Sequence, residues 1–219
     1  MLTQKEFYKL SKTNQHKEFE KFLEEIIFDK EKRKDFYINL IEEDYTCIQD
    51  DIFRQYFEEY SSERKTNQQD YTPEKVAKLL QDLTNNDSYM SVDYTAGTGT
   101  LLCKRWEHDR KKISPFEYCP SNYFYGTWEK ADNCIPYLIH NMCIRGMNGY
   151  IIHGDVLEKN VKQIYFIQNI NNDPLGFSSV NVMPHSNEVK EYFRINNWLE
   201  KEINYKENSF EDFLNMIGV

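Results

Sequence analysis

Apolar and polar residues alternate at helical spacing along the first 62 residues. Aromatic and aliphatic side chains recur every three or four positions, and charged residues fill the positions between them. This period is typical of amphipathic helices that bury one face. We therefore predict a helical N-terminal domain over 1–62 and a polar linker over 63–70. The apolar positions that carry the pattern include Phe19, Leu23, Ile26, Phe36, Leu40, Ile52, Phe53 and Tyr56.

A different pattern begins at residue 71. Short apolar runs that end near Asp93, Gly126, Ile152 and Ile167 alternate with longer helical segments. This alternation predicts an α/β domain over 71–219, with right-handed crossovers, a parallel sheet and a ligand site at the carboxyl ends of the strands. We further predict a strand over 180–183 and helices near 192–203 and 210–217.

The first helix of this second domain has a clear start. Thr72 is suited to the N-cap, and Pro73 occupies the first helical position, where its missing N–H is not needed. Apolar residues three or four positions apart then form a stripe that we expect to be buried. They are Val76, Leu79, Leu80 and Leu83.

The segment from Asp93 to Thr100 predicts a strand end, a tight turn and a helix start. Gly97 and Gly99 allow a ligand to approach the backbone, and the free N–H groups at a helix start favour a polar group. An ordinary Gly-rich turn has the same pattern, so the segment indicates a binding site only together with other motifs. The other small residues of the turn are Thr95, Ala96 and Thr98.

Composition and charge limit the partners that we expect. The 219 residues carry a net charge of −9, and acidic residues outnumber basic ones in 1–70, 71–160 and 161–219. Nucleic-acid binding normally needs a basic face, so the isolated chain should bind DNA weakly. No apolar run approaches about 20 residues and the N-terminus is polar, which predicts a cytoplasmic protein with no membrane segment. The five cysteines form no Cys-x-x-Cys pair, so we expect no metal site.

Four motifs, in this order and spacing, resemble those of the gamma-class N6-adenine DNA methyltransferases. The resemblance is greatest to the modification subunit of type I restriction-modification systems, and it covers about 71–160. Residues 1–62 resemble the N-terminal domain of that subunit in position and character. The motifs are Tyr71 to Pro73, Asp93 to Gly99, Tyr125 to Glu129 with Asn141 to Gly146, and Gly154 to Leu157.

The resemblance implies a Rossmann-like domain that binds S-adenosylmethionine across the strand ends. Glu129 would accept from the ribose hydroxyls, and Asp155 with Val156 would meet the adenine. An acid after the second strand is suited to a ribose diol by its chemistry, although a solvated acid at a helix start is equally common. Around the methionine end the resemblance places Tyr71, Thr72, Pro73, Asp93, Thr95, Ala96, Gly97, Thr98 and Gly99.

The catalytic loop is the motif that departs from the family. The family has Asn-Pro-Pro and an aromatic residue after the fourth strand, where they hold and stack on an extruded adenine. Here Asn172 and Pro174 are the candidate catalytic residues, but the neighbouring positions are Asp173 and Leu175. A lost stacking ring weakens base capture by about 1–3 kcal/mol. A plain turn is the alternative, because Asn, Asp and Pro are turn formers.

Two functions follow from these expectations. The first is an S-adenosylmethionine-dependent DNA adenine N6-methyltransferase, or the methyltransferase subunit of a restriction-modification system, with a protein partner that supplies target recognition. The alternative is a catalytically impaired S-adenosylmethionine-binding protein that acts through protein partners on a restriction or defence system. Methylation of RNA or protein is a third possibility, and it requires that the altered loop serve another acceptor.

Overall fold

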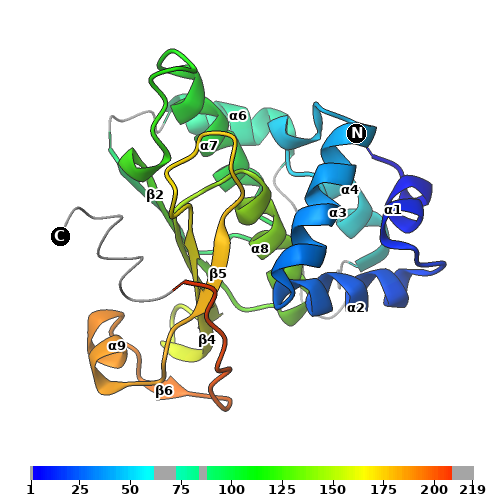
Figure 1. Cartoon of the computed structure of the whole chain (residues 1–219). Coiled ribbons are helices and arrows are strands. Elements are labelled where there is room, and N and C mark those ends of the chain that lie inside the picture. Colours follow the sequence, from blue (N-terminus) through cyan, green and yellow to red (C-terminus); the bar gives the residue numbers. More distant parts are fainter. Residues whose placement is uncertain (1, 62–72, 84–87, 209–219) are drawn as a thin grey trace.

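The computed structural model describes residues 2–61, 73–83 and 88–208 and contains a six-stranded sheet (Figure 1). Most helices cover one face of the sheet, and the short α9 lies against the other. The strands are β1 (Met90–Asp93), β2 (Phe124–Glu129), β3 (Gly149–Asp155), β4 (Asn160–Gln168), β5 (Ser179–Val182) and β6 (Asn197–Trp198). The helices are α1 (Gln4–Ser11), α2 (His16–Ile27), α3 (Lys30–Glu43), η1 (Cys47–Gln49), α4 (Arg54–Tyr56), η2 (Phe57–Ser61), α6 (Glu74–Leu83), α7 (Thr100–Lys111), η3 (Pro120–Asn122), η4 (Asp132–Cys134), α8 (Ile135–Ile144) and α9 (Asn187–Tyr192).

The strands follow the order β1-β2-β3-β4-β5, and β6 pairs with β4. β1, β2 and β3 are parallel because the helices α7 and α8 return the chain between them. β4 follows β3 after only four residues, so it runs antiparallel to β3, with Tyr150 opposite Phe166. β5 is antiparallel to β4. The prediction of a parallel fourth strand was therefore wrong, since a short connection reverses the chain and cannot make a parallel crossover.

The helix α8 lies at the centre of the protein. All ten of its residues are buried, because the sheet covers one side and the N-terminal helices cover the other. Nε2 of His140 donates to the Leu23 carbonyl (2.9 Å), and its Nδ1 accepts from the Tyr37 hydroxyl (2.7 Å). Burial lowers the pKa of His140 to about 3, which keeps the ring neutral in this arrangement. The helices before residue 62 therefore share one hydrophobic core with the sheet, and the linker predicted over 63–70 lies outside the described residues.

The helix α6 begins where the sequence predicts. The Pro73 carbonyl accepts from the N–H groups of Val76 (2.8 Å) and Ala77 (2.9 Å). The expected buried stripe is wrong, however: α6 lies beside α7, and its buried residue among those described is Ala77. The stripe residues are exposed, at 42% for Val76, 55% for Leu79, 39% for Leu80 and 73% for Leu83.

The C-terminal part is less helical than we expect from the sequence. The strand predicted over 180–183 is present as β5. The helix predicted over 192–203 is absent, because α9 ends at Tyr192 and the left-handed conformation of Arg194 (φ 54°) turns the chain into β6. The helix predicted over 210–217 lies outside the described residues.

Candidate functional site

The turn between β1 and α7 depends on two glycines and is hydrogen-bonded to the neighbouring strand. Gly97 and Gly99 have positive φ angles of 57° and 100°, which favour glycine. A Cβ atom on Gly99 would lie 2.8 Å from Cδ1 of Leu138. The turn is fixed to β2 through the Ala96 N–H, which donates to the Trp128 carbonyl (3.0 Å). The backbone conformation thus favours glycine at both positions, and close packing against Leu138 adds to the requirement at Gly99.

Glu129, at the end of β2, contacts this turn directly. Its Oε2 accepts from the Gly97 N–H (2.7 Å), and its Oε1 accepts from the Ala131 N–H (2.7 Å). Each carboxylate oxygen has a second lone pair, so Glu129 can still accept from two further donors. The structure therefore brings together Gly97 and Glu129, which are far apart in the sequence.

Asp93, at the end of β1, has an unsatisfied oxygen. Its Oδ1 accepts from the Thr95 N–H (3.0 Å), whereas the buried Oδ2 has no hydrogen-bond partner among the described residues. Burial raises the pKa of Asp93 above its ordinary value. A buried acceptor without a donor is costly in a folded protein. Asp93 is therefore suited to a ligand that brings a donor or a positive charge.

Both carboxylate oxygens of Asp155, at the end of β3, already accept hydrogen bonds. Its Oδ1 accepts from the N–H groups of Leu157 (2.9 Å) and Glu158 (3.0 Å), and its Oδ2 accepts from Lys130 Nζ (2.9 Å). The hydrogen bond from Lys130, followed by that from the Glu158 N–H, lowers the pKa of Asp155 to about 2. The next residue, Val156, packs partly against the cluster on the α9 face of the sheet. An adenine amino group would have to compete with Lys130 for the Asp155 carboxylate.

Asp51 is a buried acid that the sequence analysis does not identify. Its Oδ2 accepts from the hydroxyls of Thr98 (2.5 Å) and Thr100 (2.9 Å), and its Oδ1 accepts from Nδ2 of Asn141 (2.7 Å). Asn141 also donates to the Thr98 carbonyl (2.9 Å). The hydroxyl of Thr98 therefore faces the N-terminal helices and positions the turn from behind. Only an acid before the apolar pair Ile52-Phe53 hints at this role in the sequence.

The remaining predicted cofactor residues differ in exposure, and two of them lie outside the described residues. Ala96 is buried, whereas Thr95 is exposed beside Asp93. Pro73 lies at the start of α6 and is exposed. Tyr71 and Thr72 lie outside the described residues.

Asn172 and Pro174 lie at the opposite end of the sheet. Because β4 is antiparallel, the loop after it emerges where β2 begins. Oδ1 of Asn172 accepts from the Ser121 N–H (2.8 Å), and its Nδ2 donates to Cys119 Sγ (2.8 Å). Pro174 is exposed. The expectation that these two residues meet the Gly97 turn at one edge is therefore wrong, and its cause is the direction of β4.

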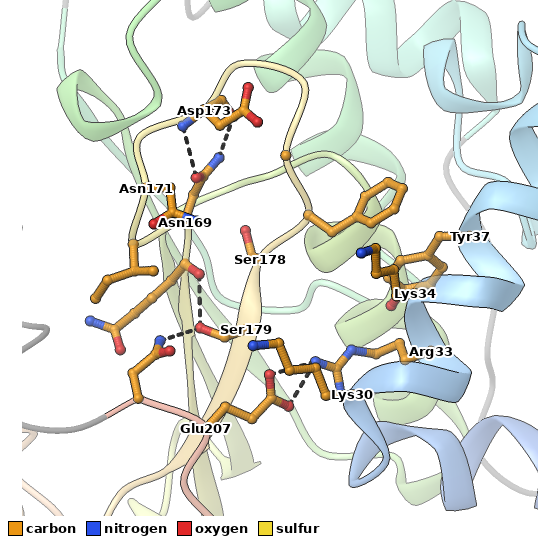
Figure 2. A pocket seen from close by; sticks show the side chains of 15 residues that line it. Lys30, Arg33, Lys34, Tyr37, Asn169, Asn171, Asp173, Ser178, Ser179 and Glu207 are labelled. Atoms are coloured by element: carbon orange, nitrogen blue, oxygen red, sulfur yellow. Dashed lines mark hydrogen bonds and ion pairs between the residues drawn. The ribbon is translucent and has the colours of Figure 1, made fainter.

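A cavity of about 280 Å³ lies at this amino end, between α3 and the loop after β4 (Figure 2). Arg33 and Glu207 form a buried ion pair on its wall, with two contacts of 2.7 Å. The Asn169 side chain holds the loop through Asp173, donating to its carbonyl (2.7 Å) and accepting from its N–H (3.1 Å). None of the predicted cofactor residues lines this cavity. Its wall is a structural brace between α3 and the sheet.

Comparison with known proteins identifies the family. A family model described as N-6 DNA methylase matches residues 46–213, about three quarters of the chain. The chain belongs to the N-6 DNA methylase family. The match includes the Gly97 turn, Glu129, Asp155 and the loop at Asn172. No curated protein and no solved structure matches the chain.

Family membership supports DNA N6-methyltransferase activity for this N-6 DNA methylase chain. Within the described ranges, no helix has the length and apolar character needed to span a membrane. The same residues contain no group of three or more His, Cys, Asp or Glu side chains arranged to hold a metal ion. Four of the five cysteines are buried, and Cys119 is half-buried.

Proposed function

We propose that this chain is the S-adenosylmethionine-binding subunit of a DNA adenine N6-methyltransferase, and that its cofactor site is the carboxyl end of β1 and β2. The observation that supports this most strongly is the Glu129 carboxylate bound to the Gly97 N–H (2.7 Å). It joins a glycine turn to an acid after the second strand, which is the arrangement of a Rossmann-like nucleotide site.

The donor set fits S-adenosylmethionine. Oδ2 of Asp93, which has no hydrogen-bond partner in the described part of the chain, provides an acceptor for the ligand's amino group. The remaining lone pairs of Glu129 provide acceptors for the ribose diol. Asp155 would contribute only after release from Lys130, whose side chain is exposed and can move away into solvent at little cost. When bound, S-adenosylmethionine supplies an electrophilic methyl group. The chain's own residues hold and orient the ligand and keep the glycine turn in place.

The position of the Asn172 loop favours a division of labour. This loop is held at the amino end by Ser121 and Cys119, so it does not face an acceptor at the carboxyl end. We therefore infer that a protein partner supplies target recognition, as in a restriction-modification system, and that the chain alone binds DNA weakly because of its net charge of −9. The same observation favours the second candidate, an S-adenosylmethionine-binding protein that has lost methyl transfer.

Two measurements test the proposal. Calorimetry with S-adenosylmethionine, or with its demethylated product, should show one site per chain. Transfer of a labelled methyl group to unmethylated DNA, with and without candidate partner subunits, then separates the two candidates. Absence of binding heat would contradict both, whereas binding without transfer under any condition would leave only the second.

A further inference from the structure

Asp51 contacts the glycine turn from the side of the N-terminal helices and is 3% exposed. Its Oδ2 accepts from the hydroxyls of Thr98 (2.5 Å) and Thr100 (2.9 Å). Its Oδ1 accepts from Nδ2 of Asn141 (2.7 Å) and from the Phe53 N–H (3.1 Å). An ionised carboxylate has about four sites that accept hydrogen bonds, so these donors occupy all of them. Asp51 therefore binds groups of the protein itself, and its carboxylate has no site left for a ligand.

The two threonines that Asp51 binds lie on either side of Gly99. Gly99 has a φ of 100°, and hydroxyl groups fixed to one carboxylate oxygen hold this left-handed residue between them. The turn also contains Gly97, whose N–H donates to Glu129 (2.7 Å). Because Gly97 directly precedes Thr98 in the chain, a shift of Thr98 would also move the Gly97 N–H. Asp51 is thereby linked to Glu129 through two residues of the turn.

The segment that carries Asp51 is itself fixed to α8. The Ile52 N–H donates to Oδ1 of Asn141 (3.3 Å). Arg145 donates to the same oxygen (2.9 Å) and to the Asp50 carbonyl. Asn141 and Arg145 are 1% and 3% exposed, and a buried network of polar groups that satisfy each other specifies a single arrangement. The position of the Asp51 carboxylate therefore follows from the packing of the N-terminal segment against α8.

We propose that Asp51 is a positioning residue for cofactor binding, and that it acts by holding Thr98 and Thr100 and thus the N–H groups of the glycine turn. The inference rests on the proposed cofactor site and extends it to a segment before residue 62. A binding site keeps its geometry through residues behind it whose own positions are fixed. The family match begins at residue 46, so it includes this segment and leaves out α1, α2 and α3.

Calorimetry with the demethylated product of S-adenosylmethionine tests the proposal on the full chain. In Asp51→Asn the amide keeps one acceptor oxygen and places an NH2 group against donors, so the turn should lose its fixed position. The affinity should fall about tenfold or more, a loss of about 1.4 kcal/mol or more.

The matched control is Asp109→Asn, at the other end of α7. Asp109 is 1% exposed and accepts from Nε of Arg105 (2.9 Å) and from the Tyr125 hydroxyl (3.1 Å). It lies about 13 Å further along the helix than Thr100. Asp109→Asn should also lower the free energy of unfolding in urea, but the affinity should change by less than about twofold, because distant sites act independently. The comparison separates a loss of stability from a loss of position.

Thr98→Val tests the same link by a milder change, should Asp51→Asn fail to fold. It removes one donor to Asp51, whereas Thr98→Ser keeps the hydroxyl and should retain more affinity. Where both variants fold, the loss in Asp51→Asn with Thr98→Val should be smaller than the sum of the two single losses, because both changes break the same hydrogen bond. Equal affinities of Thr98→Val and Thr98→Ser, or additive losses, would contradict the proposal.

Hydrogen exchange in the ligand-free protein tests the position of the turn without the cofactor. The N–H groups of Ala96, Gly97 and Gly99 are hydrogen-bonded, so they should exchange about tenfold faster or more in Asp51→Asn and at the wild-type rate in Asp109→Asn. If the wild type shows no binding heat, the proposed function fails, and the exchange comparison still decides the role of Asp51. Unchanged exchange over 96–99 in Asp51→Asn would overturn that role. So would equal affinities of Asp51→Asn and the wild type, or equal losses in Asp51→Asn and Asp109→Asn.

Discussion

The two ends of the parallel strands differ in what they can do. At the carboxyl end, Gly97 and Glu129 meet, and Asp93 has a buried oxygen that no described residue hydrogen-bonds. At the amino end, the Asn172 side chain already forms hydrogen bonds with the Ser121 N–H and with Cys119 Sγ. The first end has acceptors that remain available to a ligand, and the second has polar groups that already satisfy each other. One reversed strand thus moves a motif to the other end of the sheet without changing its place in the sequence.

The largest expected effect is at the glycine turn. Valine at position 97 would be forced into a left-handed conformation that β-branched residues avoid (φ 57°), and its N–H would lose alignment with Glu129. Gly97→Val should therefore reduce the affinity for S-adenosylmethionine more than about 100-fold in calorimetry, a loss of about 2.7 kcal/mol or more. Helical content by circular dichroism should stay nearly unchanged.

Gly176→Ala is the control at the amino end. A Cβ atom there would lie 3.0 Å from Cβ of Asp173 in an exposed loop, and the affinity should change by less than about twofold. Equal affinities of the wild type and Gly97→Val would contradict the assignment of the carboxyl end.

A smaller loss is expected at Glu129. The two oxygens of Glu129 accept from the N–H groups of Gly97 and Ala131. An amide has only one acceptor oxygen, so in Glu129→Gln one of these N–H groups would face the NH2 group of the glutamine. Replacing a charged hydrogen bond costs about 1.5–3 kcal/mol, so the calorimetric affinity should fall about tenfold or more. Glu158→Gln removes the same charge from an exposed residue after β3 and should have no measurable effect. Equal losses in both variants would indicate a general charge effect.

Asn172→Ala should affect stability alone. The change removes two side-chain hydrogen bonds and places alanine in a left-handed conformation (φ 51°), so the free energy of unfolding should fall by about 1–2 kcal/mol in urea titration. Cofactor affinity should stay within twofold. Asn172→Gly removes the same bonds and keeps the conformation, so it should lose less. Methyl transfer that is present in the wild type and lost in a folded Asn172→Ala would show that the loop does meet the acceptor.

The smallest effect concerns the half-buried Asp93. Its pKa is raised by burial, so at pH 7 the ionised carboxylate destabilises the folded state relative to the unfolded one. Asp93→Asn should raise the thermal midpoint by about 1–3 °C at pH 7 while weakening cofactor binding. The difference in midpoint should vanish below the ordinary pKa of about 4, where the carboxyl is protonated in both states. A lower midpoint at pH 7 would show that Asp93 has a stabilising partner.

Local signals predicted much of this structure. The strand ending at Asp93, the helix after Gly99 and the start of α6 after Pro73 follow from short-range conformational preferences. The link between Gly97 and Glu129 was predictable because parallel strands bring their carboxyl ends together.

Other features depend on packing that no local pattern contains. The direction of β4 is decided by the four-residue connection after Asp155, and helical periodicity does not say which face of α6 meets α7. Asp51 contacts Thr98 across 47 positions of sequence, so its role is visible only after folding. The place of Asn172 follows from the direction of β4, so it too could not be predicted from local patterns.

Hydrogen exchange of the wild-type protein, with and without the demethylated cofactor product, tests the difference between the two ends most directly. We expect slower exchange over 94–99 and 129–131 on binding, because these N–H groups lie in the turn and beside Glu129. Exchange over 169–178 should not change. Protection confined to 169–178, or protection at neither end in the presence of saturating ligand, would contradict the assignment of the cofactor site to the carboxyl end of β1 and β2.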